Sequence, residues 1–383
     1  MFQRLRESIP ALRDRVYLNT GTSGPMPQQA FEKEVELLEV IYREGFSSPP
    51  ALAAYSQALA EAKKALASVL ACDPGTLALT HSTSDGLGMV ASGLDWRPGD
   101  EVIISDLEHV SGVAPWRELA LRRGIVVKEL KSEGGYLEPS RVIEAITSRT
   151  KLICISHVSY ATGAVLPVRE VCATAREMGV LVVVDGAQAA GHLPIDVAAL
   201  GCDFYAVPGQ KWLLGPEGTG ALYVAPHALD KLSPSRIGWA SIAGEGEGPD
   251  GIALHADARR YETGTVHAPA FAALAQSIRT LEGLGWPNIF ERAKSLARRA
   301  AQGLSELEGV RVLTPTWAGS GLLTFAVVGA EPERIVKELW AKRRIVIRSI
   351  PRPAALRASF HAFNDESDVD ALVSAVAEAA RSA

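Results

Sequence analysis

The strongest constraint on the fold is a regular alternation of short apolar runs and amphipathic stretches between residues 77 and 226. The apolar runs predict strands, and the stretches between them, such as 139–146 and 168–178, predict helices. Strands separated by helices are typical of a mostly parallel, doubly wound sheet in an α/β protein. We expect strands at residues 77–80, 101–105, 125–129, 152–157, 180–185, 204–207 and 220–224.

The pattern changes after Pro226. A long amphipathic helical region is expected from residue 270 to about residue 307, followed by a smaller α/β unit. That unit is expected to contain strands 322–328, 345–350 and 358–362 and helices 332–340 and 367–380. We therefore expect an N-terminal segment that packs on the small domain (1–30), a large domain (31–265), and a linking helix with the small C-terminal domain (266–383).

Composition narrows the class of protein. The chain has 383 residues and a net charge of -5, which gives no electrostatic reason to expect nucleic acid or an anionic membrane as partner. No run of about 18 apolar residues occurs, and the charged N-terminus does not resemble a signal peptide. The cysteines, Cys72, Cys154, Cys172 and Cys202, form no CxxC pair. We expect no metal site, no disulfide framework and a cytoplasmic location.

Polar clusters follow the expected strands, where ligands bind in doubly wound sheets. Asp185 ends the apolar run LVVVD, and a carboxylate there needs a cation or a hydrogen-bond donor. It could cap the next helix or pair with the protonated ring nitrogen of a cofactor, and the motif alone does not decide. Ser82, Thr83 and Ser84 begin a helix whose free N–H groups could bind phosphate, or they form only a polar cap.

Lys211 is an isolated lysine in the apolar, glycine-rich stretch FYAVPGQKWLLGPEGTGALYV (204–224). Apolar surroundings disfavour the ammonium form, which makes the amine a usable nucleophile. A lysine in a solvated loop is the alternative, and the adjacent Trp-Leu-Leu makes it the weaker interpretation.

Residues 246–251 match G-x-G-x-x-G letter for letter. A dinucleotide site needs a strand before these glycines and a helix after them. We expect no strand to lead into this segment, and Glu245, Glu247 and Asp250 would repel a phosphate. The match therefore does not indicate a nucleotide site.

DGAQ at one strand end and QKWLLGPEGTGALYV after the next strand resemble the class V aminotransferase family. This family includes cysteine desulfurases, isopenicillin N epimerase-like proteins, kynureninases and C–S lyases. The resemblance extends from YLNTGTSGPMP (17–27) to RASFHAFN (357–364), nearly the whole chain. It implies fold type I of the pyridoxal-phosphate enzymes, pyridoxal 5'-phosphate held by the large domain, and a homodimer with shared active sites.

The resemblance also implies roles for individual residues. Lys211 would carry the cofactor as a Schiff base and move protons at the substrate α-carbon, and Asp185 would meet the pyridine nitrogen. His109 would stack on the cofactor ring. Arg357 would bind the substrate α-carboxylate, with Asn19 as a further substrate contact. Further cofactor contacts are implied for Ser82, Thr83, Ser84, Tyr160, Gln188 and Gln210, and for Thr265 toward the phosphate of the partner subunit.

Three departures from the family pattern matter. Pro208 and Gln210 replace a serine and a histidine before the lysine, and proline offers neither a hydroxyl nor an N–H group. Tyr160 stands where desulfurases often have asparagine, and it could donate to the cofactor oxygen, act on the substrate or only pack. No cysteine follows Cys202, so the segment before Arg357 lacks the thiolate on which desulfurases form a persulfide.

Desulfurase activity is therefore disfavoured. Transamination is the first expectation, followed by β-elimination, including C–S lysis, and then by epimerisation with Tyr160 or His109 as the acid on the opposite face. This order depends on family membership more than on any residue. A non-catalytic protein is disfavoured, because a scaffold has no need of Lys211, Asp185 and Arg357 together. Arg348 or Arg352 could bind a second acidic group, although an ordinary surface position is the preferred interpretation for each.

Overall fold

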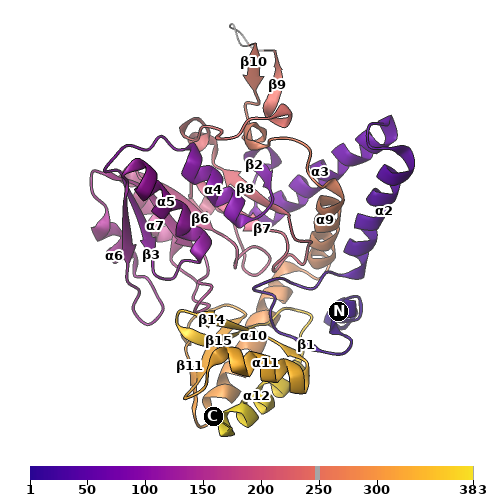
Figure 1. Cartoon of the computed structure of the whole chain (residues 1–383), viewed down its shortest axis with the longest axis vertical. Helices are drawn as coiled ribbons and strands as arrows, with labels where there is room; N and C mark the ends of the chain where they lie inside the picture. The colour runs from indigo at the N-terminus through magenta and orange to yellow at the C-terminus, as the bar shows by residue number, and fades with distance from the viewer. Residues whose placement is uncertain (246–250, 383) are drawn as a thin grey trace.

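The computed structural model describes residues 1–245 and 251–382 of the chain. A large unit built on a seven-stranded sheet lies above a smaller unit that carries the C-terminus (Figure 1). Helices α2 (Gln28–Glu44) and α3 (Pro49–Leu70) pack against α9 (Ala268–Glu282) at one side of the large unit. Each unit has its own cluster of buried apolar side chains.

The large sheet has the strand order β2-β8-β7-β6-β5-β3-β4. Strands β3 to β7 pair in parallel, and β8 is antiparallel to both of its neighbours. This confirms the prediction of a mostly parallel sheet of seven strands. The strands are β2 (Leu77–Thr80), β3 (Glu101–Ser105), β4 (Val126–Leu130), β5 (Thr150–Ser156), β6 (Leu181–Asp185), β7 (Phe204–Pro208) and β8 (Gly220–Val224).

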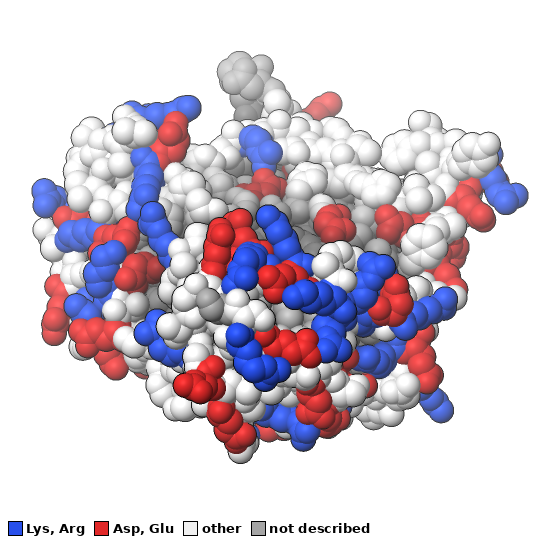
Figure 2. Space-filling model, turned by 60° about the horizontal axis from the view of Figure 1, so that its bottom comes forward, with Lys and Arg blue, Asp and Glu red and all other residues white. Residues whose placement is uncertain are grey.

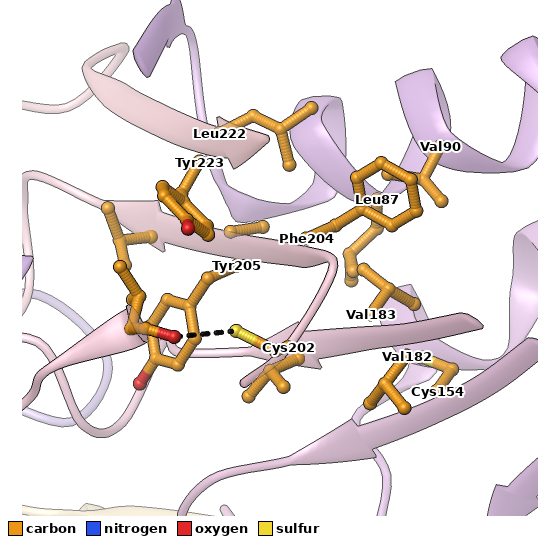
Figure 3. Packing of buried hydrophobic residues seen from close by; sticks show 14 of the residues in the cluster. Leu87, Val90, Cys154, Val182, Val183, Cys202, Phe204, Tyr205, Leu222 and Tyr223 are labelled. Atoms are coloured by element: carbon orange, nitrogen blue, oxygen red, sulfur yellow. Dashed lines mark hydrogen bonds between the residues drawn. The ribbon is translucent and has the colours of Figure 1, made fainter. Parts of the chain in front are cut away.

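The central strands β6 and β7 of this sheet are buried along their whole length. Every residue of β6 and β7 is buried, and since neighbouring side chains point to opposite faces, both faces must be covered. Leu87 and Val90 of α4 (Thr83–Gly93) gather with Val183 and Phe204 at one such contact (Figure 3). Fully burying a side chain of this size contributes roughly 1.5–3 kcal/mol, which holds the strand ends in fixed positions.

The small unit contains a four-stranded antiparallel sheet of order β11-β12-β15-β14. The strand expected at 358–362 was misplaced: β15 begins at Ala354, because it forms a tight hairpin with β14 and Pro351 already pairs with Ala354. The single strand expected at 345–350 is two strands with different partners. The elements of this unit are β11 (Val310–Val312), β12 (Leu322–Val327), α11 (Pro332–Arg343), β13 (Ile345–Val346), β14 (Arg348–Pro351), β15 (Ala354–Ser359) and α12 (Glu366–Arg381).

The N-terminal segment contacts the small unit. Strand β1 (Val16–Tyr17) pairs in parallel with β13, and Arg6 of α1 (Phe2–Glu7) lies 2.7 Å from Asp368 of α12. The helical region expected from residue 270 to residue 307 is two helices, α9 and α10 (Trp286–Ser305), separated at Gly285, which has a positive φ of 79°. Only glycine adopts this conformation readily. The limits expected for the three domains stay a prediction.

The expectation that no strand precedes the glycine-rich segment was wrong. Strand β9 (Ile242–Glu245) leads into it and pairs with β10 (Ile252–Leu254), so that a strand and not a helix follows. The two strands form the projection at the top of Figure 1. Residues 246–250, which hold most of the G-x-G-x-x-G match, lie outside the described residues.

Charges of both signs are mixed on the face shown in Figure 2, where Lys and Arg side chains alternate with Asp and Glu. Mixed charges produce no extended field of one sign on that face. Among the helices of residues 1–245 and 251–382, none is both long enough and apolar enough to cross a bilayer.

Candidate active site

A cavity of about 240 Å³ lies at the carboxyl ends of the parallel strands. Ligands of doubly wound sheets bind at this edge. The cavity also takes in residues of the N-terminal segment and of the β14–β15 hairpin. Ten of the predicted site residues line it: Ser82, Thr83, Ser84, His109, Tyr160, Asp185, Gln188, Gln210, Lys211 and Arg357.

Lys211 lies just beyond the end of β7 and is partly exposed within the cavity. Burial of its amine lowers the pKa of Lys211 to about 8, and the positive charges of Arg357 and Arg348 act in the same direction, whereas Asp185 opposes them. A lysine with this pKa is neutral in about a tenth of molecules at pH 7, far more than an ordinary lysine, and the neutral amine is the nucleophilic form.

Asp185 is the last residue of β6 and is 4% exposed. Its Oδ1 accepts a hydrogen bond from the amide of Ala187 at 2.8 Å, so it closes the turn after the strand. Burial raises the pKa of the Asp185 carboxyl, while Lys211 and the Ala187 amide act in the opposite direction. The capping interpretation and the ligand interpretation of Asp185 are therefore compatible, because one oxygen serves the turn and the side chain still lines the cavity.

The start of α4 forms one end of the cavity. Ser82 caps the helix by accepting a hydrogen bond from the amide of Asp85 at 3.1 Å. Thr83 is buried, and its hydroxyl has no hydrogen-bond partner within the described structure; the same holds for the side-chain oxygen of Gln210. Buried polar groups without partners are costly, so they indicate that a polar ligand completes this end of the cavity.

His109 and Tyr160 form one wall. Their rings meet edge to face, with centroids 5.0 Å apart. The backbone amide of Ser111 donates to Nδ1 of His109 at 3.3 Å. Burial, together with the charges of Lys211, Arg348 and Arg357, lowers the pKa of His109 to about 4. The imidazole is therefore neutral at physiological pH, which suits it to stacking and removes it as a charged acid.

Gln188 is held by two hydrogen bonds that leave one donor for its predicted contact with the cofactor. Its Oε1 accepts a hydrogen bond from the indole of Trp212 at 2.9 Å, and its Nε2 donates to the carbonyl of Gly21 at 2.8 Å. One hydrogen of the amide remains for a ligand. Trp212 is fully buried and stacks on His192 at a centroid distance of 3.6 Å. This network of contacts holds Trp212, the residue next to Lys211, in place.

Arg357 enters the cavity from β15 of the small unit and is 1% exposed. Its guanidinium donates to the carbonyl of Tyr160 and to the hydroxyl of Thr22, both at 3.1 Å. Burial and the charge of Arg348 lower the pKa of Arg357 to about 9, which leaves it a cation at neutral pH. No carboxylate lies within ion-pair distance of it among the described residues, so its natural partner is an anionic ligand.

Two predicted site residues lie outside the cavity wall. Asn19 accepts a hydrogen bond from Thr22 at 2.7 Å and so contacts the wall without being part of it. Thr265 is exposed on the surface, away from the cavity of its own chain. Its predicted role toward a partner subunit stays a prediction, as do the assigned roles of the ten lining residues.

Several lining residues were missed by sequence reasoning, chiefly Thr22, Ser111 and Ser156. Ser156 ends β5 beside Asp185 in the sheet, so the strand-end rule that selected Asp185 could also have selected it. Thr22 could not have been found in this way, since it lies on a segment far from the sheet in sequence. Arg348, which the sequence left as an ordinary surface residue, lines the cavity.

Comparison with known proteins identifies the family. The model of the family described as Aminotransferase class-V matches residues 16–372. This chain belongs to the class V aminotransferase family. The fold expected from the resemblance, fold type I of the pyridoxal-phosphate enzymes, is thereby confirmed, and the family's cofactor is pyridoxal phosphate.

The curated relatives carry several activities. A probable cysteine desulfurase of Methanothermobacter thermautotrophicus is 31% identical, over 96% of this chain and 95% of the relative. An isopenicillin N epimerase of Streptomyces clavuligerus is 32% identical, over 94% of both chains. The family is therefore established at full length, whereas the reaction is not determined by these names.

Solved structures give the same result. The cystine C–S lyase C-DES, in complex with its product cysteine persulfide, superposes with a TM-score of 0.91 at 30% identity, covering 97% of this chain and 99% of that one. A mutant of C-DES with glycine covalently linked to the PLP cofactor gives 0.92 over the same shares of the two chains, also at 30% identity. The cysteine desulfurase of Thermococcus onnurineus NA1 gives 0.91 at 28% identity, covering 99% of this chain and 98% of that one.

The residues of the cavity fit pyridoxal phosphate. The helix start with the unpartnered Thr83 hydroxyl suits the phosphate, Asp185 suits the ring nitrogen, and Lys211 suits the aldehyde. Arg357 would suit a carboxylate. Pro208 lines the cavity without a donor, and the unpartnered oxygen of Gln210 requires a donor from elsewhere, so phosphate binding falls mainly to the start of α4.

Proposed function

We propose that this protein is a pyridoxal-phosphate-dependent lyase that breaks the Cβ–S bond of a sulfur-containing amino acid by β-elimination. Bound pyridoxal phosphate supplies an aldehyde that joins the substrate amine and a ring that withdraws electrons from the α-carbon. The protein selects the bond that breaks. The positions of bases, cations and thiols around the cavity determine that selection.

The observation that carries the proposal is the position of the thiols. None of the four cysteines lines the cavity, and Cys154, Cys172 and Cys202 are buried. Figure 3 shows Cys154 and Cys202 within the core, where Cys202 contacts the carbonyl of Val197. Burial raises the pKa of all four thiols. Sulfur released from a substrate therefore has no protein thiolate to accept it. It must leave the cavity as part of a small-molecule product.

The β14–β15 hairpin supports the same conclusion. It brings Arg348 and Arg357 to the cavity through adjacent strands, where the two residues are register partners. The connection between Pro351 and Ala354 is a tight turn without a cysteine. A segment this short and this closely paired leaves no flexible loop on which a thiol could approach the substrate.

Lys211 is the group that would move protons in this reaction. Its pKa of about 8 lets it exchange a proton near neutral pH. Once neutral, it can take the α-proton and return it to the departing sulfur. Arg357 would hold the α-carboxylate, and Arg348, which lines the same cavity, would favour a substrate with a second acidic group.

Transamination, which was the first expectation from the sequence, becomes the second candidate. The first proton transfer by Lys211 is the same, and two arginines at one cavity also suit a dicarboxylic amino acid. Epimerisation needs an acid on the face opposite the lysine. The low pKa of His109 leaves Tyr160 as the more suitable group for that role. The exposed Thr265 agrees with a homodimer whose subunits share active sites, and we include this assembly in the proposal.

The test is turnover without a keto acid. Purified holoenzyme is incubated with L-cystine, S-alkyl cysteines and dicarboxylic amino acids in turn, and keto acid and ammonia are measured. Elimination predicts many equivalents of both products per subunit from a sulfur amino acid. A burst of one equivalent of keto acid without ammonia would indicate an aminotransferase, and a D-amino acid would indicate an epimerase.

A further inference from the structure

A second carboxyl group lies directly behind the cavity. Glu108 follows β3 and is 6% exposed. Its Oε1 accepts a hydrogen bond from the hydroxyl of Ser105 at 2.6 Å, and its Oε2 lies 2.5 Å from the hydroxyl of Ser156. Because Ser156 lines the cavity, Glu108 is one hydrogen bond away from whatever the cavity binds.

The surroundings of Glu108 favour its neutral form. The ionisable groups that face it are Asp185 on β6 and Cys154 on β5, and no cation pairs with it in the part of the chain that the structure describes. Burial raises the pKa of Glu108 to about 7; Asp185 adds to this effect, while the hydroxyls of Ser105 and Ser156 oppose it. A carboxyl group in such a place exchanges its proton near neutral pH.

The two serine hydroxyls differ in what else they contact, and Ser156 is the one that lines the cavity. The Ser105 oxygen already accepts from the amide of Leu107 at 3.2 Å, while its own hydrogen points to Oε1. Ser156 donates to Oε2 in the structure. When Glu108 takes up a proton on Oε2, this bond reverses and the Ser156 oxygen becomes its acceptor. The hydrogen of Ser156 is released toward the cavity. When Glu108 loses its proton to solvent, Ser156 must donate to Oε2 and offers the cavity only lone pairs.

We propose that Glu108 is a positioning residue that, through Ser156, sets whether the cavity beside Asp185 contains a hydrogen-bond donor or only an acceptor. Ser156 and Asp185 are register partners at the ends of β5 and β6. A donor beside Asp185 stabilises its carboxylate, and an ionised Asp185 favours the protonated ring nitrogen of the cofactor. This inference depends on the proposed cofactor site and not on the reaction that follows.

The test measures the protonation state of the cofactor's ring nitrogen directly. Holoenzyme loaded with pyridoxal phosphate labelled with nitrogen-15 in the ring is titrated through neutral pH without substrate, and the nitrogen-15 chemical shift is followed. The wild-type protein is expected to show a one-proton transition centred near pH 7, toward the value of neutral pyridine as pH rises. Glu108→Gln, which cannot ionise, is expected to abolish the transition, and Ser156→Ala is expected to remove most of its amplitude.

Ser105→Ala is the matched control, because Ser105 contacts the other oxygen of Glu108 and does not line the cavity. It should keep the transition and move its midpoint to higher pH, since one donor to the ionised form is lost. A purely structural role for Glu108 predicts lower thermal stability with an unchanged transition.

A wild-type signal that is flat through neutral pH, or a transition that survives Glu108→Gln at the same midpoint, would overturn the proposal. Full wild-type amplitude in Ser156→Ala would do so as well, since the effect would then be one of charge alone. No substrate is present, so failure of the proposed lyase reaction leaves this test intact.

Discussion

The amino ends and the carboxyl ends of the strands in the large sheet, called here its amino edge and its carboxyl edge, differ in how their buried carboxyl groups are paired. At the amino edge, Glu101 is 1% exposed and lies 2.7 Å from Lys128 and 3.1 Å from Arg149, with further hydrogen bonds from Thr147 and Thr150. At the carboxyl edge, Glu108 lies seven residues later, beyond the other end of the same strand, and has two hydroxyl donors and no cation among the described residues.

The pKa values follow this difference. Burial alone would raise the pKa of Glu101, but Lys128, Thr147 and Thr150 outweigh it and lower the pKa to about 2. Burial raises the pKa of Glu108 to about 7. The amino edge therefore neutralises its charges internally and serves stability, whereas the carboxyl edge leaves buried groups incompletely paired and available for a ligand.

The largest effect is expected at Lys211. Replacing it by alanine removes both the covalent attachment point of the cofactor and the base, so activity should fall by about 10³–10⁴-fold or more. Borohydride treatment of the holoenzyme, followed by peptide mapping, should label Lys211 in the wild type and nothing in the variant. Lys128→Ala at the amino edge is the control and should retain the label. Labelling of another lysine in Lys211→Ala would contradict the assignment.

The next largest effects should distinguish the roles of the two arginines of the β14–β15 hairpin. Arg357→Lys removes a planar fork from a fully buried position, and KM should rise by about 10–100-fold. Arg348→Lys should change KM by only a few-fold for a substrate with one carboxylate, and by more for one with two. Steady-state kinetics with both substrate types measure this difference. Equal effects of the two variants on a monocarboxylic substrate would refute the division of roles.

The two glutamates should shift stability in opposite directions. The pKa of Glu101 is depressed from 4.5, so its contribution is present above about pH 4.5 and is lost as pH falls through about 2. Glu101→Gln should therefore lower the free energy of unfolding at pH 7 by about 1–3 kcal/mol, because Lys128 and Arg149 lose their partner.

The pKa of Glu108 is raised, so its contribution is present below about pH 4.5 and is lost as pH rises through about 7. Glu108→Gln should equal or exceed the wild type in stability above pH 7, by up to about 2–3 kcal/mol. Denaturant unfolding of both variants at two or more pH values measures the contrast. Loss of stability in both variants at alkaline pH would remove the distinction between the edges.

The smallest effect is expected for His227, a half-exposed residue at the amino edge. His227 lies 2.9 Å from Asp203, whose other oxygen accepts from the amide of Val182. Since His227 is about half exposed, His227→Ala should cost only about 0.5–1 kcal/mol and leave activity unchanged. A drop in activity comparable to that of Arg357→Lys would show that the amino edge also serves catalysis.

Local patterns predicted the large sheet well because most residues of its interior strands are apolar. The bounds of each predicted strand lie within two residues of the observed bounds. The small unit was predicted less accurately: β15 was placed four residues late, because its start depends on pairing with β14 rather than on an apolar run. The strand-end rule and the family motifs located ten of the lining residues.

Thr22 and the position of Arg348 could not be predicted, because both depend on how the N-terminal segment and the small unit meet the sheet. The role of Glu108 was also hidden in the sequence, where a glutamate next to a motif histidine looks like a solvated neighbour. Only the hydroxyls on its two sides and the lack of a described cation distinguish it.

The central claim is that the enzyme releases sulfur without a thiol of its own. The most direct measurement compares the wild-type holoenzyme with a variant in which Cys72, Cys154, Cys172 and Cys202 are all replaced by alanine, using L-cystine as substrate. The account predicts that the correctly folded variant keeps the rate of pyruvate release within about threefold, and that neither protein carries a persulfide by mass spectrometry. Loss of turnover in a folded, cofactor-loaded variant would contradict it, and so would a persulfide on a wild-type cysteine with alanine as product when L-cysteine replaces L-cystine as substrate.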